Sequence, residues 1–359
     1  MTDALVLSAG RQLVALADAL AEATVVCEFG QRPELRARYG PTGRWKARQD
    51  AVAHFAQLGN AVDLHSPALF NDHVAWAKAL LHEQGIGAAD LDHRLACMAD
   101  VIRAQLPAAV AGPAVEMTDG ARAALPAMPS TTVSLIDDER PLAALARSYM
   151  RTLLGGYRQA AARLVFDAAD RGEPVGRLYL HVFQPALREV GRLWQTNRIN
   201  VAQEHFCSAS TQVVMAQLLP LAITEQRRGR RVVVVCVGGE LHDLGARMVA
   251  DFFEMDGWDA FFCGADTPQA AVGQTVVERA ADVLAVSATM GHRLHAVQDL
   301  VERVRAHPRC ARLRILVGGH PFTVDPALWR TVGADGSAAD AEAAVASANR
   351  WLTSAGSSA

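Results

Sequence analysis

The stretch VVVVCVGGELHDLG at residues 232–245 decides the fold of the last third of this 359-residue chain. Val232–Val237 is β-branched apart from Cys236, which is typical of a strand buried on both faces of a sheet. The glycines and polar residues that follow, as far as Gly245, predict a loop that leads into a helix. Further strands are predicted at Trp258–Phe262, Val283–Ser287 and Leu313–Val317, with a short last strand near Val332–Ala334.

Helical stretches separate these strands, so residues 229–359 predict a Rossmann-like, doubly wound parallel sheet. Ligands of such sheets bind beyond the carboxyl ends of the strands. Ser287 and Thr289 follow one predicted strand, and Gly318-Gly319 follow the next. A further loop, residues 333–336, is also small and polar. We expect these loops to border a deep slot that suits a long, narrow ligand group.

Residues 137–228 predict a four-helix bundle in front of this sheet. Breaks in the helical pattern fall at Gly155-Gly156, at residues 171–174 and at residues 196–200. Connections this short make consecutive helices antiparallel neighbours. A link rich in proline and alanine, near residues 125–136, precedes the bundle.

Residues 1–128 predict an all-α domain. His73 and Trp76 lie on one apolar stripe with Leu69 and Leu80, and Gly85-Ile86-Gly87 ends that helix. The stretch Gly30–Gly43, which contains two prolines and several arginines, predicts an exposed loop. The fold class is therefore multidomain, α and α/β.

Composition narrows the function classes. The 35 Lys and Arg nearly balance the 38 Asp and Glu, which argues against a broad nucleic-acid-binding surface. We expect a cytoplasmic protein, because the chain shows neither a signal-peptide layout nor an apolar run long enough to span a membrane. The six cysteines contain no CxxC pair and are interpreted as reduced thiols. No pattern of catalytic residues is found, so the chain is not predicted to be an enzyme.

Glu240 and His242 are spaced for metal chemistry. A histidine in a strand-end loop can present one ring nitrogen to a metal while a carboxylate two residues away holds the other. With Asp243, Gly245 and the small loops, this pattern resembles the cobalamin-binding domain of methionine synthase and its relatives. The resemblance implies His242 as the lower cobalt ligand, Glu240 hydrogen-bonded behind it, and a slot along Ser287, Gly318 and Gly319 for the nucleotide tail. Many members carry Asp at the position of Glu240.

A second motif lies in the bundle. Trp194, nine intervening residues and Glu204-His205 fall on the hairpin between the third and fourth helices. The motif resembles that of the light-dependent cobalamin-binding transcriptional regulators. That resemblance implies that Trp194 and Glu204 contact the adenosyl group, and that His205 becomes a second cobalt ligand after light breaks the cobalt–carbon bond.

The first block lacks the winged-helix start and basic recognition helix of those regulators, so direct DNA binding is not expected. The order of the domains resembles the photocobilins, which pair cobalamin with biliverdin. This implies a globin-like pocket for biliverdin, with His73 and Trp76 as contacts and an arginine cluster near its propionates. Cys27 and Cys97 lie outside any bilin-attachment motif. The arginines are Arg32, Arg36, Arg38 and Arg44.

Three functions stay open at this point. The first is an adenosylcobalamin photoreceptor whose output is light-dependent homo-oligomer assembly or binding of a downstream signalling protein. The second is a corrinoid methyl carrier, which needs the sheet and bundle but not the Trp194 motif. The third is a cobalamin or redox sensor that acts through a transcription factor.

Overall fold

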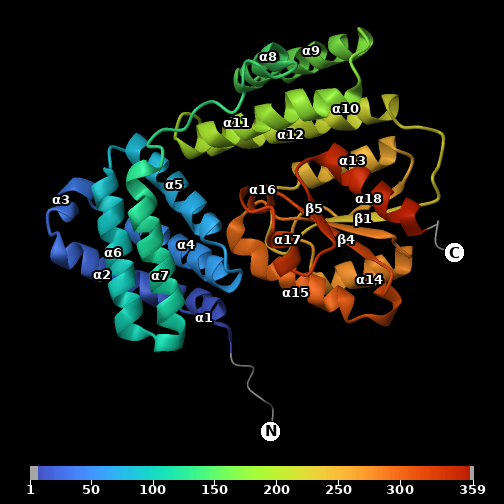
Figure 1. Ribbon diagram of the computed structural model, residues 1–359. Helices are drawn as coiled ribbons and strands as arrows, with labels where there is room; N and C mark the ends of the chain where they lie inside the picture. Colours follow the sequence, from blue (N-terminus) through green and yellow to red (C-terminus); the bar gives the residue numbers. More distant parts are fainter. Residues whose placement is uncertain (1–6, 356–359) are drawn as a thin grey trace. The chain divides into compact units, whose positions relative to one another are not determined.

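The computed structural model describes residues 7–355 and divides into two compact units. Unit 1 comprises residues up to 131 with residues 290–295 and 324–332. Unit 2 comprises residues 132–289, 296–323 and 333 onward. Figure 1 labels their helices and strands.

Unit 1 confirms the all-helical prediction for the first block. Its core is formed by apolar side chains such as Leu13, Phe55, Phe70 and Leu95, all of which are fully buried. The helices are α1 (Ala9–Ala15), α2 (Ala17–Gln31), α3 (Leu35–Tyr39), α4 (Gly43–Asp63), α5 (Pro67–Glu83), α6 (Ala88–Gln105) and α7 (Ala108–Ala124), followed by the short 3₁₀ turn η1 (Leu125–Ala127).

Two glycines allow α1 and α4 to cross closely. A Cβ atom on Gly10 would lie 1.9 Å from the carbonyl oxygen of Gly59, and one on Gly59 would lie 2.5 Å from that of Gly10. Any side chain at either position would push the two backbones apart. This crossing therefore depends on glycine in both helices.

The prediction of an exposed loop across Gly30–Gly43 is wrong in its middle, where α3 forms. Leu35 is fully buried in a small cluster with Val25, Phe29 and Ala47, and Tyr39 packs against the same cluster. Burial of Leu35 stabilises a helical turn that the flanking prolines and glycines conceal in the sequence.

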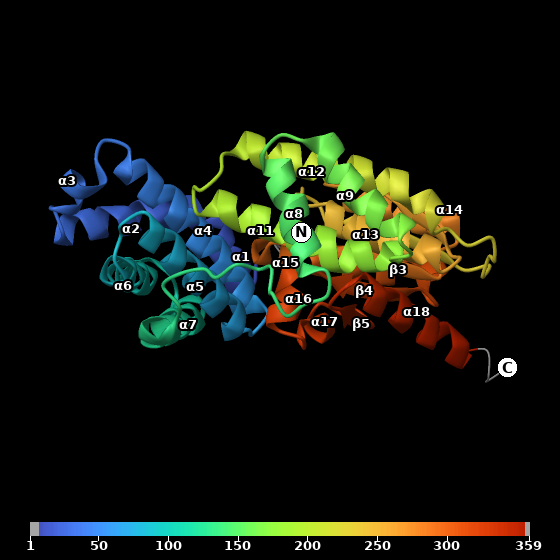
Figure 2. The ribbon, with the colours of Figure 1, turned by 90° about the horizontal axis from the view of Figure 1, so that it is seen from above.

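The bundle in unit 2 confirms the predicted four-helix arrangement, and Figure 2 shows its helices side by side. Tyr149, Val182, Phe183 and Val214 are among its fully buried core side chains. The third helix is continuous through a π-helical turn, η2. The segments are α8 (Ala143–Leu154), α9 (Arg158–Asp170), α10 (Val175–Leu178), η2 (Tyr179–Phe183), α11 (Gln184–Gln195), α12 (Val201–Leu218) and the closing turn η3 (Leu219–Leu221).

The last part of the chain forms the predicted parallel sheet, which in the described residues has five strands in the order β2-β1-β3-β4-β5. Every pair of neighbouring strands is parallel. The strands are β1 (Arg231–Cys236), β2 (Asp259–Phe262), β3 (Val283–Ser287), β4 (Arg314–Gly318) and β5 (Gly336–Ala338). The helices between and after them are α13 (Leu244–Met255), α14 (Gln269–Arg279), α15 (Leu294–Arg305), α16 (His320–Val324), α17 (Leu328–Thr331) and α18 (Ala341–Ala355).

Helices cover both faces of this sheet. Val232 and Val234 point to the face on which Phe253 of α13 and Ala348 of α18 are buried. Helices α14 and α15 lie on the opposite face (Figure 1). Burial on both sides explains why Val232–Val235 is a continuous run of valines instead of an alternating pattern.

The predicted last strand at Val332–Ala334 is wrong. Val332 follows α17, and Gly333 has a positive φ of 79° that belongs to a turn. The actual strand, β5, begins at Gly336 and is composed of Gly, Ser and Ala. Its short length and small residues give none of the β-branched signal on which strand prediction depends.

The bundle packs on α13, the helix that follows the 232–245 stretch. Met248 is buried in the bundle core, and Phe252 lies 3.2 Å from where a Cβ atom on Gly176 would be. The Tyr179 hydroxyl donates to the Asp251 carboxylate and to the Met215 carbonyl, at 3.0 Å each. Because a hydroxyl has one proton, these two acceptors compete for it.

In the part of the chain that the structure describes, no helix is both long and apolar enough to cross a membrane.

Candidate metal centre

The register of the sheet brings the predicted loops to one edge. Cys236 of β1 pairs with Ser287 of β3, Ser287 with Gly318 of β4, and Gly318 with Ala338 of β5. Because parallel strands end at the same edge, the loops after these residues start side by side. The 232–245 stretch is therefore next to the loop that contains Thr289, and Gly319 follows β4, one strand further along the sheet.

Glu240 is buried under this edge and is fully engaged. Its side chain is 1% exposed. One carboxylate oxygen lies 2.5 Å from His242 Nδ1 and accepts the His242 backbone N–H at 3.0 Å, and the other accepts the Thr289 N–H at 2.7 Å. Burial opposes ionisation, but these hydrogen bonds outweigh it and lower the pKa of Glu240 to about 2. The group is a carboxylate at neutral pH.

The His242 ring turns Nδ1 toward this buried carboxylate and leaves much of the rest of the side chain exposed. Its side chain is 60% exposed although its Nδ1 is held by Glu240. The hydrogen bond to Glu240 raises the pKa of His242, partial burial lowers it, and the negative charges of Glu240, Glu204 and Asp243 raise it further. With Nδ1 as the donor to Glu240, the neutral ring offers Nε2 to a ligand. Leu241, which is 72% exposed, adds an apolar side chain beside it.

Asp266, in the loop after β2, supports the motif and was not identified from the sequence. Its carboxylate accepts the Gly239 N–H at 2.6 Å, and its own N–H donates to the Glu240 carbonyl at 2.9 Å. These two bonds hold the backbone on both sides of Glu240. Asp266 lies 26 residues from Glu240 and carries no motif, so the sequence offered no signal for it.

The remaining predicted residues around His242 have mixed environments. Asp243 precedes α13, and its carbonyl accepts the Arg247 N–H at 2.8 Å. Gly245 is exposed, and a Cβ atom there would meet nothing within 4 Å. Gly319 differs, because a Cβ atom would lie 2.0 Å from the Ala288 carbonyl oxygen and its φ is +112°. Glycine at 319 is thus required by the protein's own backbone, whatever ligand lies nearby.

The bundle motif lies on the α11–α12 hairpin. Trp194 is in the last turn of α11 and is 43% exposed. Asn200 caps α12 through a reciprocal pair of hydrogen bonds with Gln203, which places Glu204 in the first turn of that helix. The Glu204 carboxylate lies 2.6 Å from His205 Nδ1 and accepts the Ser208 hydroxyl at 2.7 Å. The His205 side chain is 74% exposed.

The two motifs lie within electrostatic range of each other. The charge of Glu204 is among the causes that raise the pKa of His242, although the two residues are on different elements of unit 2. Both histidines share one arrangement, in which a glutamate engages Nδ1 and the side chain stays exposed. Each can therefore present Nε2 to a metal.

The two histidine nitrogens suit a metal that is already held within a larger cofactor. Among the residues described, no cluster of three or more His, Cys, Asp or Glu side chains can hold a bare ion. A histidine fixed by a carboxylate can serve as the protein ligand of a metal whose other ligands come from a macrocycle. The residues around His242 fit a corrinoid cofactor in this respect.

In unit 1, the predicted contacts His73 and Trp76 lie together on α5. Their rings stack with centroids 5.8 Å apart. His73 is buried, and its Nε2 lies 2.7 Å from Nδ1 of the equally buried His54 on α4. Burial lowers the pKa of His73 to about 4, so the ring is neutral. His73 therefore has a hydrogen-bond partner within the protein, while Trp76 is 39% exposed.

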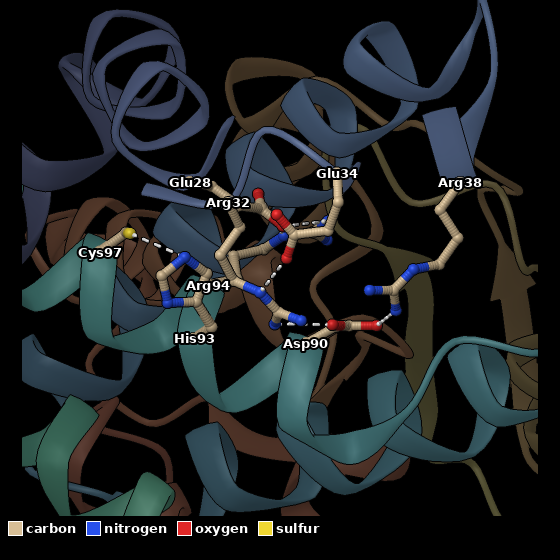
Figure 3. A network of polar contacts seen from close by, with 8 residues as sticks. All are labelled: Glu28, Arg32, Glu34, Arg38, Asp90, His93, Arg94 and Cys97. Atoms are coloured by element: carbon tan, nitrogen blue, oxygen red, sulfur yellow. Dashed lines mark hydrogen bonds and ion pairs between the residues drawn. The ribbon is translucent and has the colours of Figure 1, made fainter. Parts of the chain in front are cut away.

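The arginine cluster of unit 1 is largely paired with acids, as Figure 3 shows for Arg32 and Arg38. Both donate to the buried Asp90, at 2.7 and 2.5 Å. Arg44 pairs with Glu22 at 2.5 Å. Arg36 and Arg44 border a shallow surface hollow with Phe29. Three of the four predicted arginines thus take part in ion pairs that hold α2, α3, α4 and α6 together.

Comparison with known proteins agrees with this geometry. A family model described as a B12 binding domain matches residues 230–347, and a second model with the same description matches residues 145–219. The HTH-type transcriptional repressor CarA of Myxococcus xanthus is 28% identical over 182 residues, which are 50% of this chain and 60% of CarA. Dimethylamine corrinoid protein 3 of Methanosarcina acetivorans is 31% identical over 116 residues, or 32% of this chain and 54% of that protein.

This chain thus spans between about half and three fifths of the length of these curated relatives. The structure of the Methanosarcina barkeri monomethylamine corrinoid protein superposes with a TM-score of 0.52 at 18% identity. It covers 59% of this chain and 100% of its own length, which shows a shared fold. The chain therefore contains a cobalamin-binding module, built from a helical cap and a Rossmann-like domain, and is distantly related to repressors such as CarA and to corrinoid proteins.

Proposed function

We propose that this chain is a light sensor that binds adenosylcobalamin, with His242 as the lower cobalt ligand. The observation that carries the proposal is the exposed Glu204-His205 pair, whose carboxylate lies within electrostatic range of His242. Adenosylcobalamin, when bound, supplies a cobalt–carbon bond that light can break. A protein that only stores a corrinoid has no need of a second histidine prepared as a ligand.

Each residue of the hairpin has a distinct role in this proposal. Trp194 offers an exposed aromatic face, on which the adenosyl group packs. Glu204 accepts hydrogen bonds from the adenosyl group, and before illumination it also engages His205 Nδ1. His205 would be the residue that offers Nε2 to cobalt once the adenosyl group has left. These events need no catalytic group, so the proposed role is not enzymatic.

The test is the absorption spectrum of the adenosylcobalamin complex, recorded in darkness and after green light. Three proteins are compared: the parent, His205→Ala and His82→Ala, in which an exposed histidine of α5 is removed as the matched control. We expect light to change all three spectra. The lit spectra of the parent and His82→Ala should coincide, and that of His205→Ala should differ because water replaces the ring nitrogen.

Identical lit spectra for the parent and His205→Ala would show that His205 is not the upper ligand. If light changes the spectrum of the parent complex no faster than it changes that of free adenosylcobalamin, the proposed light sensing is contradicted. Neither result would affect the lower-ligand role of His242, which is measured separately.

A corrinoid methyl carrier is the second candidate, and the relationship to the dimethylamine corrinoid protein favours it. Such a carrier exchanges methyl groups with partner methyltransferases. It would hold methylcobalamin in darkness and lose the methyl group to an acceptor only when a partner enzyme is added. Demethylation that needs no light, and that proceeds equally well in His205→Ala, would favour the carrier over the sensor.

We further propose biliverdin as a second chromophore of unit 1, in line with the resemblance to photocobilins. The stacked His73 and Trp76 and the hollow beside Arg36 and Arg44 support this assignment. Protein purified from cells that make biliverdin should then absorb red light. Trp76→Ala should weaken that band, whereas Tyr157→Ala, which removes an exposed aromatic side chain of unit 2, should not.

A further inference from the structure

Two cysteines that are far apart in sequence meet between α2 and α6 of unit 1. The sulfur atoms of Cys27 and Cys97 are 2.8 Å apart, although the residues are separated by 70 positions. A disulfide bond measures about 2.05 Å, and both thiols are free here. The two sulfur atoms are therefore close to bonding distance, and only a small movement would let a bond form.

The two thiols differ in access. Cys27 is partly exposed and lines an open groove between the helices with Ala23 and Val101. Cys97 is fully buried. Burial raises the pKa of the Cys97 thiol, and the hydrogen bond from Cys27 raises it further. A reagent that enters the groove thus meets Cys27 first.

Polar neighbours hold the pair in place. Gln31 Nε2 donates to the Cys27 sulfur at 3.2 Å, one turn further along α2. His93 Nε2 lies 3.9 Å from the Cys97 sulfur, one turn earlier on α6, and Figure 3 shows this contact. Close by, Glu28 and Arg94 form a buried ion pair that also joins α2 to α6. The helices that carry the two thiols are therefore fixed relative to each other.

We propose that Cys27 and Cys97 form a reversible disulfide when the protein meets a peroxide. The Cys27 thiolate attacks one peroxide oxygen, which gives a sulfenic acid on Cys27 and, with hydrogen peroxide, releases hydroxide. The Cys97 sulfur then attacks the Cys27 sulfur. The sulfur–sulfur bond forms, the Cys27 S–O bond breaks, and the Cys97 proton leaves with the hydroxyl group as water. Cys97 acts as the resolving thiol, and a dithiol reductant restores both thiols.

The disulfide would join α2 to α6 across a long loop of chain. A link between residues 70 positions apart restricts the unfolded chain and so favours the folded unit. The oxidised protein should therefore unfold at a higher temperature than the reduced protein. This modification is independent of cobalamin and of light.

The experiment uses the full reduced chain, treated with increasing hydrogen peroxide, blocked with an alkylating reagent and digested without reductant. We expect a cross-linked peptide that contains Cys27 and Cys97 and disappears after dithiothreitol. In Cys97→Ser, oxidation should stop at a Cys27 sulfenic acid that dimedone traps. Cys263→Ser, which removes a partly exposed cysteine of unit 2, should give the same cross-link as the parent.

Three results would overturn the proposal. One is oxidation of Cys27 in the parent to sulfinic acid without any cross-linked peptide. Another is a cross-link that pairs Cys27 with some other cysteine. The third is unreacted Cys27 under conditions that modify Cys263. Because the parent protein alone decides among these outcomes, the test stands even if the Cys97→Ser variant does not fold.

Discussion

At the scale of single residues, the Glu240 carboxylate controls both the tautomer and the charge of His242. The two are neighbours in sequence, so their pairing follows from the motif and could be predicted. Their environment could not. Glu240 is almost fully buried, whereas His242 is largely exposed. The contacts around Glu240 come from Thr289 and Asp266, in loops that only the folded sheet brings near.

Removing the carboxylate tests this relationship. In Glu240→Gln, the neutral amide still fills the space but no longer orients and polarises the ring as an anion does. We expect affinity for cobalamin to fall by roughly tenfold to a hundredfold, as is usual when the partner of a metal-bound histidine is replaced. Absorbance titration measures the affinity. Glu302→Gln, an exposed change on α15, serves as the control, and equal affinities for the two variants would contradict the role.

The pH dependence of binding follows from the same pair. The pKa of His242 is raised above its ordinary value of 6.5, chiefly by the hydrogen bond to Glu240. Cobalt needs the neutral ring, so a protonated His242 must release its proton on binding. Affinity for aquocobalamin should therefore rise with pH and level off above the raised pKa. In Glu240→Gln the midpoint should move to lower pH, and an unmoved midpoint would show that another group titrates.

At the scale of elements, the buried valine run and the helical breaks made most of the sheet and bundle predictable. Val232–Val237 and Val283–Ser287 correspond to β1 and β3 within one residue, because buried parallel strands are rich in β-branched side chains. Strand β5 and helix α3 were not predicted, because their sequences carry no such pattern. Three small residues carry no strand pattern, and α3 depends on the burial of Leu35 against helices distant in sequence. The Cys27–Cys97 contact escaped prediction for the same cause.

Tyr179 links two elements and gives a direct test of how the bundle is held on α13. Tyr179 belongs to the π-helical turn, and its hydroxyl reaches Asp251 of α13, the helix that follows His242 in the chain. Tyr179→Phe keeps the ring but removes a hydrogen bond to the buried Asp251, which keeps its ion pair with Arg247. We expect a loss of about 1–3 kcal/mol in the free energy of unfolding, measured by chemical denaturation.

Tyr157→Phe is the matched control for that change. Tyr157 is 68% exposed, so losing its hydroxyl should alter stability by less than about 0.5 kcal/mol. If both variants unfold like the parent, the Tyr179–Asp251 hydrogen bond contributes nothing to the packing of the bundle on α13.

At the scale of the whole molecule, the proposed output is a change of assembly. In the proposed function, light would act by changing how the chain associates with its own copies or with a partner protein. Size-exclusion chromatography with light scattering, run on the adenosylcobalamin complex in darkness and after green light, should show a change in mass. The same mass in both states would contradict light-dependent assembly while leaving the cofactor assignment intact.

The central claim is that His242 binds cobalt, and electron paramagnetic resonance of the cobalt(II) form tests it most directly. The nucleus of an axial nitrogen splits the cobalt lines, into triplets for ¹⁴N and doublets for ¹⁵N. Protein grown with ¹⁵N-labelled histidine should therefore give doublets, and labelled His242→Ala should lose them. Triplets that persist in the labelled parent would show that the cofactor's own nucleotide base, and not His242, is the axial ligand.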